Sequence, residues 1–260
     1  MKLAFLGGGR MAEAIISSIL TKDIAKPSEV AVGEPVQDRR TYLTQRYGIQ
    51  STPSNCEALK QASLIILAVK PQTLPAVVPE IKQALTPQQT ILSIMAGVRI
   101  RMLMQELSHP AIIRVMPNTP AQVGAGMSVW TSSPEVPEHA QSLTQQILQS
   151  LGEEIYVSDE HLLDMATAIN GSGPAYVFRF IEALIDAGVY LGMARDVARK
   201  LVIETVVGSA KLQGGTWTLV NGGAMTWGAS DFVGSSASTF ISCSTVRQSV
   251  RFWSSFMPAR

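Results

Sequence analysis

The sequence predicts an α/β protein in which a parallel-sheet domain is followed by a helical domain. Three observations predict it: short apolar runs alternate with helical patterns from residue 1 to about 157, a glycine triplet ends the first apolar run, and long helical patterns replace the strands from Glu160. Such alternation is typical of βαβ units, whose parallel strands are buried on both faces. We expect a sheet domain at residues 1–158, a helical domain at 159–212 and an atypical tail at 213–260.

Six short apolar runs, mostly rich in Ile, Leu and Val, are the expected strands. Their lengths suit buried strands, and helices are expected in the gaps between them. The first run meets glycines so early that it is too short for a signal peptide or a membrane span. The expected strands are residues 3–6, 30–33, 64–69, 90–94, 111–115 and 155–157.

Three long helical patterns follow the sheet domain. The second is apolar nearly all round, with Arg179, Glu182 and Asp186 on a single stripe at i, i+3 and i+7. Such a helix is buried against a partner subunit, which favours an oligomer, or it is central to its own domain. The patterns cover residues 160–170, 174–191 and 195–212.

The tail differs in composition from the rest of the chain. Residues 213–260 contain no Lys, no Glu and one Asp, and they show no sustained period of a helix or a strand, so no helix is expected there. The abrupt change suggests the hypothesis that the coding frame shifts near Leu212. Resequencing the gene tests it, and an intact frame encoding this tail in independent isolates would contradict it.

The composition excludes several classes of partner. The chain is 46% hydrophobic with a net charge of +1, and it has no basic run with interleaved aromatics, so neither nucleic acid nor an anionic membrane is an expected partner. Its two cysteines, Cys56 and Cys243, lack the spacing of a disulfide framework or a zinc site. We expect a cytoplasmic protein that binds a small molecule and no metal.

A segment that matches G-x-G-x-x-[GA] follows the first expected strand and opens a helix. The first glycine makes a tight turn, the second lets the backbone approach a pyrophosphate, and the small Ala12 permits close packing of helix on sheet. The helix N-terminus adds N–H groups and positive dipole. The segment predicts a Rossmann-type domain that binds a nicotinamide dinucleotide through Gly7, Gly8, Gly9, Arg10 and Met11.

The residues after the second expected strand bear on the choice of cofactor. Glu34 is placed to accept hydrogen bonds from the adenosine ribose, which favours NADH. Arg39 and Arg40 could instead pair with the 2′-phosphate of NADPH, or they could form a solvated helix face. The sequence leaves the choice between NADPH and NADH open.

Four further motifs follow in order along the chain. Together with the glycine segment, their order and spacing closely resemble the pyrroline-5-carboxylate reductase family over roughly residues 1–212. The motifs are AVKP at 68–71, SIMAGV at 93–98, RVMPNTP at 114–120 and GSGPAY at 171–176.

The resemblance implies reduction of the cyclic imine 1-pyrroline-5-carboxylate to L-proline, the last step of proline biosynthesis, with NADPH or NADH. It also implies an all-helical dimerisation domain, and hence a homo-oligomer. Several motifs fall just after strand ends, where open parallel sheets bind ligands, and this places Lys70, Pro71 and Asn118 at the cofactor mouth. By similarity, the remaining cofactor residues are Ala68, Val69, Ala96, Gly97 and, on the adenosine side, Asn55. Lys70 could alternatively be a solvated loop lysine, and Asn55 a helix cap.

Ser172, Gly173 and Pro174 are the candidate substrate-binding residues. Proline is favoured in a first helical turn, and preceding glycines let backbone N–H groups face a carboxylate. The alternative is an ordinary helix start. Hydride transfer to a protonated imine needs no strong acid, and we interpret the three histidines, His109, His139 and His161, as surface or loop residues.

The chain departs from the family at two places. The family carries a segment resembling D-x-V-T-S-P-G-G-T-T after its third helix, which supplies the substrate pocket and a hydroxyl near the imine nitrogen. Residues 213–260 do not contain it, so the dimerisation domain is truncated or replaced at its end and no catalytic residue is assigned. Arg10 stands where the family typically has Asn, and it could bind the pyrophosphate or crowd it. Because the missing segment would complete the substrate pocket and the dimer, the alternative function is a catalytically impaired dinucleotide-binding protein. A two-domain dehydrogenase that acts on a hydroxy acid is disfavoured, because it would carry a catalytic lysine on the first helix of its second domain. Residues 160–170, which form that helix here, contain no lysine.

Overall fold

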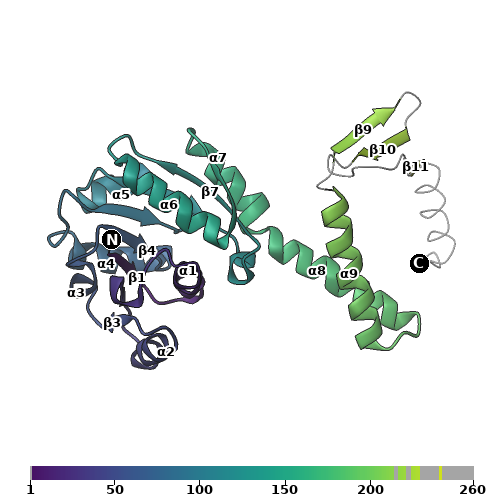
Figure 1. Cartoon of the computed structure of the whole chain (residues 1–260), viewed down its shortest axis with the longest axis horizontal. Helices are drawn as coiled ribbons and strands as arrows, with labels where there is room; N and C mark the ends of the chain where they lie inside the picture. The colour runs from purple at the N-terminus through teal and green to yellow at the C-terminus, as the bar shows by residue number, and fades with distance from the viewer. Residues whose placement is uncertain (1, 214–215, 221–223, 229–239, 242–260) are drawn as a thin grey trace. The chain divides into compact units, whose positions relative to one another are not determined.

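A computed structural model describes residues 2–213, 216–220, 224–228 and 240–241. The chain divides into two compact units, Met1–Val177 and Phe178–Arg260. The first unit holds a single eight-stranded sheet with helices on both faces, the purple-to-teal part of Figure 1. The predicted α/β class with a Rossmann-type sheet is confirmed.

The strand order is β3-β2-β1-β4-β5-β6-β7-β8. The first six strands are parallel, whereas β7 runs antiparallel to β6 and β8 runs parallel to β7. The prediction lacked β3, which is short and polar at the sheet edge, and β7, whose sequence mixes Gly, Ser and Thr with apolar residues. The strands are β1 (Leu3–Leu6), β2 (Val30–Gly33), β3 (Gln50–Thr52), β4 (Leu64–Leu67), β5 (Thr90–Ser93), β6 (Ile112–Met116), β7 (Gly126–Ser132) and β8 (Gly152–Tyr156).

Alternate residues of the central strands feed two separate cores. In β1, Leu3 and Phe5 face one core while Ala4 and Leu6 face the other, and all four are buried. This explains why the parallel strands are apolar without alternation. The first core lies under α1 (Arg10–Thr21), α2 (Gln37–Tyr47) and α6 (Glu138–Leu151), and the second under α3 (Asn55–Leu59), α4 (Leu74–Ile81) and α5 (Ile100–Leu107). Short 3₁₀ turns are η1 (Pro27–Glu29), η2 (Pro71–Thr73) and η3 (Thr119–Val123).

The topology places the candidate site. The chain leaves β1 for β2 and β3 on one side, and then returns to β4 on the other side of β1. At such a switch point, the loops after neighbouring strands diverge and leave a crevice outside the carboxyl ends of the strands. The glycine turn and the segment after β4 meet at this carboxyl edge of the sheet.

The helical part begins with α7 (His161–Ala166) and a π-helical turn, η4 (Thr167–Gly171). They are followed by α8 (Gly173–Tyr190) and α9 (Arg195–Gln213), which agree with the expected patterns. Within the described chain only Ile185 of α8 is buried, so the alternative that this helix is central to its own domain is wrong. None of the described helices combines the length and apolar content that a bilayer crossing requires.

The described part of the tail forms a small antiparallel sheet, in the order β11-β10-β9. Its strands are β9 (Thr216–Val220), β10 (Ala224–Gly228) and β11 (Phe240–Ile241), and the sequence showed no period that predicts them. The expectation of an atypical tail otherwise falls on residues outside the described ones.

Candidate functional site

The glycine turn between β1 and α1 is shaped by its first glycine. Gly7 has a φ of +97°, and a Cβ there would lie 2.9 Å from the carbonyl oxygen of Ala68. Its N–H donates to the carbonyl oxygen of Gly33 at 2.8 Å. Because a side chain would be strained at this φ and would collide with backbone, only glycine fits between the ends of β2 and β4.

Gly9 is the N-cap of α1, with an ordinary φ of −67°. Within the described chain, no neighbouring atom lies within 4 Å of a Cβ built on it. Ala12 is buried beneath and lets α1 pack on the sheet. The turn is therefore open at a helix N-terminus, where N–H groups and the helix dipole favour phosphate. This cradle fits the pyrophosphate of a dinucleotide.

Arg10 and Met11, the two residues after the glycines, lie in different surroundings. Arg10 is exposed and, within the part of the chain that the structure describes, makes no hydrogen bond or ion pair. Its guanidinium is therefore free to approach a phosphate at the same helix end. Met11 is half-buried and packs against the first core. A structural role for Met11 is thus as well supported as contact with a cofactor.

Glu34 reaches from the end of β2 back to the glycine turn. Its Oε2 accepts a hydrogen bond from the N–H of Gly8 at 2.9 Å, and its Oε1 accepts from the N–H of Val36 at 3.0 Å. A Cβ on Gly8 would lie 2.8 Å from Leu43 and 3.2 Å from Glu34 Oε2. The middle glycine of the triplet therefore allows this carboxylate to lie against the turn.

Arg39 is held by groups of the protein itself. Its Nε donates to the carbonyl oxygen of Gly8 at 2.6 Å, and its Nη2 pairs with Glu13 at 2.6 Å. Burial opposes ionisation of Glu13, but hydrogen bonds from Arg39, Tyr42 and Tyr47 outweigh it and lower the pKa of this carboxyl. Arg39 thus braces α1 against α2.

Arg40 is also engaged at its own end of the crevice. Its Nη1 donates to the carbonyl oxygens of Glu34 and Pro35 at 2.7 and 2.8 Å, and its Nη2 bonds to Gln37. The suggestion that Arg39 and Arg40 form a merely solvated helix face is therefore wrong, because both guanidinium groups bond protein acceptors.

Asn55 lies beside the end of β2, where a Cβ on Gly33 would lie 2.5 Å from its Oδ1. Its N–H and Nδ2 each donate to a carboxylate oxygen of Glu80 at 2.7 Å. The cap of α3 is Ser54, whose side chain accepts from the N–H of Glu57 at 3.3 Å. The alternative that Asn55 caps this helix is therefore wrong.

The loops after β4 and β5 lie at the same carboxyl edge of the sheet, next to the glycine turn. Atoms of Ala68 and Val69 lie nearest to a Cβ built on Gly7, so these two residues are neighbours of the glycine turn. Lys70, Ala96 and Gly97 are exposed, and Pro71 begins η2. Lys70 makes no ion pair within the described residues, so its ammonium is available to a ligand.

Asn118 is fixed by a network that the sequence did not suggest. Its Oδ1 accepts from the N–H of Met127 at 2.9 Å, and its Nδ2 donates to Asn170 Oδ1 at 2.7 Å. Asn170 in turn donates to the carbonyl oxygen of Met127 at 2.9 Å. This network joins the loop after β6 to η4, and its only sequence signal is an amide beside the Gly-Ser-Gly motif.

Helix α8 begins directly after η4, at the predicted substrate residues. The N–H of Ser172 donates to the carbonyl oxygen of Thr167 at 3.0 Å, and Pro174 has no N–H. The Ser172 hydroxyl makes no hydrogen bond within the described chain. Of this segment, the hydroxyl of Ser172 and the N–H of Gly173 are thus the groups suited to a carboxylate. π-Helical turns are frequent at functional sites.

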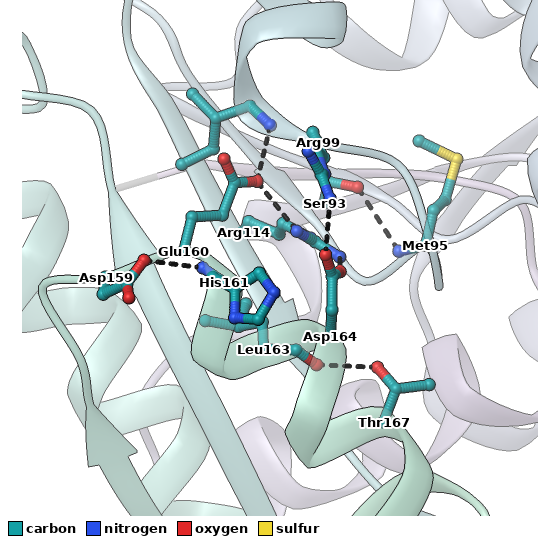
Figure 2. Close-up of polar contacts among 11 residues, drawn as sticks. Ser93, Met95, Arg99, Arg114, Asp159, Glu160, His161, Leu163, Asp164 and Thr167 are labelled. Atoms are coloured by element: carbon teal, nitrogen blue, oxygen red, sulfur yellow. Dashed lines mark hydrogen bonds and ion pairs between the residues drawn. The ribbon is translucent and has the colours of Figure 1, made fainter.

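A buried ion cluster fixes α7 to the sheet, as Figure 2 shows. Arg114 of β6 has a 2% exposed side chain and pairs with Glu160 and Asp164, each at 2.8 Å. Glu160 also accepts from the N–H of Ile100 at 2.8 Å, and Arg99 pairs with Asp164 at 3.0 Å. The hydrogen bond from Arg114 is the main cause that lowers the pKa of Asp164. A charged residue within an apolar strand was the available signal.

The histidines have no catalytic setting. His139 and His161 are exposed as predicted, whereas His109 lies in the loop after α5 but is buried, so it is not a surface residue. Its Nε2 donates to the carbonyl oxygen of Gln89 at 2.7 Å, which satisfies the ring inside the protein. No group of three potential ligands able to hold a metal ion occurs in the part of the chain that the structure describes.

Two family models match the chain: "NADP oxidoreductase coenzyme F420-dependent" over residues 2–97 and "Pyrroline-5-carboxylate reductase dimerisation" over residues 160–222. A pyrroline-5-carboxylate reductase of Synechocystis sp. is 40% identical over 212 residues, which are 82% of this chain and 79% of that protein. The chain belongs to the pyrroline-5-carboxylate reductase family. The second model extends to residue 222, past the end of the likeness expected at residue 212.

Solved structures of the pyrroline-5-carboxylate reductase family agree with the fold. The enzyme from Coxiella burnetii is 31% identical with a TM-score of 0.75, over 81% of this chain and 78% of that one. The Plasmodium falciparum enzyme, solved with NADP bound, is 34% identical with a TM-score of 0.74, over 82% and 78%. A prephenate dehydrogenase from A. aeolicus, 12% identical with a TM-score of 0.56, shares the fold alone.

Proposed function

We propose that this protein reduces 1-pyrroline-5-carboxylate to L-proline with NADPH or NADH. The observation that supports it most is the 40% identity to a pyrroline-5-carboxylate reductase over 82% of the chain. The open cradle at Gly9 and the NADP-bound relative support a dinucleotide at the glycine turn. When bound, the reduced nicotinamide supplies the hydride for the imine carbon.

The residues around the crevice have distinct proposed roles. Gly9 and the start of α1, with Arg10, bind the pyrophosphate, and Glu34 with Asn55 borders the adenosine ribose. The segment at 68–71, with Ala96 and Gly97, lines the nicotinamide side. Asn118 acts by positioning, because its amide is already bonded to Met127 and Asn170.

The start of α8 is the proposed carboxylate site. The Ser172 hydroxyl and the Gly173 N–H bind the substrate carboxylate, while Pro174 fixes the first turn of the helix. Orientation of the imine next to the nicotinamide then provides most of the rate enhancement, since a protonated imine is already electrophilic.

Self-association is part of the proposal. Helix α8 exposes large apolar side chains, among them Phe178, Phe180 and Tyr190, and the matching dimerisation model covers it. We expect a cytoplasmic homo-oligomer built on this helix. Light scattering of wild type and Phe180→Glu, with the exposed Arg199→Glu as control, tests it. A wild-type monomer would contradict it.

The activity test follows nicotinamide absorbance of the full chain with 1-pyrroline-5-carboxylate and either cofactor. Oxidation that requires the imine and yields proline supports the proposal. The alternative is a catalytically impaired dinucleotide-binding protein, which is favoured by the end of the family match at residue 222 of 260. Cofactor binding without oxidation would establish that alternative.

A further inference from the structure

We propose that Glu34 is a specificity-determining residue that makes this protein select NADH over NADPH. The inference rests on the proposed function in one respect: a nicotinamide dinucleotide binds at the glycine turn. The two cofactors differ by a phosphate on the adenosine 2′-oxygen, and in Rossmann-type domains this ribose lies beyond the end of the second strand. Glu34 follows β2 (Val30–Gly33) at that place.

The Glu34 carboxylate is fixed in position. One oxygen accepts from the N–H of Gly8 at 2.9 Å and the other from the N–H of Val36 at 3.0 Å. Each oxygen has a second lone pair, so the carboxylate can still accept hydrogen bonds from the two ribose hydroxyls of NADH. A 2′-phosphate offers it no comparable donor and brings a further negative charge. Moving the carboxylate aside would break both backbone hydrogen bonds.

The cations that could compensate are already occupied. Arg39 bonds the carbonyl oxygen of Gly8 and pairs with Glu13, both at 2.6 Å, and its guanidinium lies 5.1 Å from the ring centre of Tyr42. Arg40 donates to two backbone carbonyl oxygens at 2.7 and 2.8 Å. Arg39 is thus held by an ion pair and a backbone carbonyl oxygen, and Arg40 by the carbonyl oxygens of the two residues that follow β2. A 2′-phosphate would therefore meet the fixed negative charge of Glu34, while Arg39 is neutralised by Glu13 and Arg40 is anchored to backbone carbonyl oxygens.

Arg10 does not alter this balance. It is exposed at the start of α1, beside the cradle for the pyrophosphate, which NADH and NADPH share. Its charge therefore supports both cofactors equally. The residue that distinguishes NADH from NADPH is therefore Glu34, at the end of β2.

Calorimetric titration of the full chain with NADH and with NADPH measures the selectivity directly. We expect the wild type to bind NADH at least about tenfold more tightly. Glu34→Gln, which keeps the size of the side chain, should lower that ratio about tenfold, because NADPH binds more tightly and NADH less so. Asp38→Asn is the matched control: it removes a charge from the first turn of α2, and Asp38 is exposed and makes no hydrogen bond or ion pair within the described chain. Its ratio should stay within about twofold of wild type.

Each outcome decides the proposal. Equal or tighter binding of NADPH by wild type overturns it and leaves the proposed function intact. If Asp38→Asn changes the ratio of NADH to NADPH affinity as much as Glu34→Gln does, the proposal is also overturned. The loss of any nearby negative charge would then explain the change. Arg40→Gln should leave NADPH affinity unchanged, and a loss confined to NADPH would overturn the proposal, because Arg40 would then pair with the 2′-phosphate. Failure of both cofactors to bind would refute the proposed function together with the selectivity.

Discussion

Two glycines of the same turn should respond to alanine in opposite ways. Gly7 has a φ of +97° and a Cβ there would lie 2.9 Å from a backbone oxygen, whereas Gly9 has a φ of −67° and open space around it in the described chain. The fold itself therefore requires the first glycine and not the last. Any requirement for glycine at position 9 must come from a ligand.

The magnitudes follow from this geometry. In Gly7→Ala, the positive φ costs about 1–2 kcal/mol and the collision with a backbone that cannot yield about 1–3 kcal/mol, so unfolding should become about 2–5 kcal/mol easier. Gly9→Ala should change the stability by less than about 1 kcal/mol, because the smaller freedom of the unfolded chain stabilises by about 0.4–1 kcal/mol while alanine is a poorer N-cap than glycine by a similar amount. Its methyl group instead occupies the space that a pyrophosphate needs, which should weaken dinucleotide binding at least about tenfold.

Thermal unfolding and calorimetric titration of both variants separate these effects. Gly7→Ala should lower the Tm by at least about 4 °C, and Gly9→Ala should keep the wild-type Tm while losing cofactor affinity. The reasoning is refuted if Gly9→Ala binds NADH and NADPH as wild type does, or if its Tm falls as far as that of Gly7→Ala.

Three further predictions concern the segment that joins the sheet to α8. Arg114→Leu leaves Glu160 and Asp164 without their buried cation and should lower the free energy of unfolding by about 3 kcal/mol in urea titrations; a loss below about 1 kcal/mol would contradict a structural cluster. Because Arg114 lowers the pKa of Asp164, the ionised carboxyl stabilises the fold above its unfolded pKa of about 3.9, and this stabilisation is lost as the pH falls further. Asp164→Asn should therefore make the urea midpoint depend less on pH below about 4. A midpoint that falls with decreasing pH as steeply as in wild type would contradict this prediction. Asn170→Ala removes the partner of Asn118 at the cofactor mouth and should weaken the Kd for the cofactor about fivefold, whereas an unchanged Kd would argue against a positioning role of Asn118.

The parts of the fold that could be predicted are those with local causes. The core strands are apolar on both faces because both faces are buried, and the glycine turn has its motif because one φ and two close contacts demand it. The antiparallel strand β7 escaped prediction, since its residues are half polar and its place depends on pairing with β6 and β8. Pairing of that kind is decided by the whole sheet.

The contacts that tie the site together could not be predicted because they are distant in sequence. Asn118 meets Asn170 across 52 residues, and Arg114 meets Asp164 across 50. The sequence showed Arg39 as a candidate for a phosphate or a solvated face, but only the structure shows its bond to the Gly8 carbonyl oxygen. The acceptor that a long side chain bonds depends on the packing of neighbouring helices. The hydrophobic periodicity of the sequence therefore does not predict that acceptor.

The most direct test of the central claim is hydride transfer itself. The full chain is incubated with 1-pyrroline-5-carboxylate and NADH that carries deuterium on the reactive face of the nicotinamide, and the proline is analysed by mass spectrometry. The proposed function predicts proline labelled with one deuterium at the former imine carbon, formed in step with cofactor oxidation. Unlabelled proline, or no proline from protein that binds the cofactor, would contradict it.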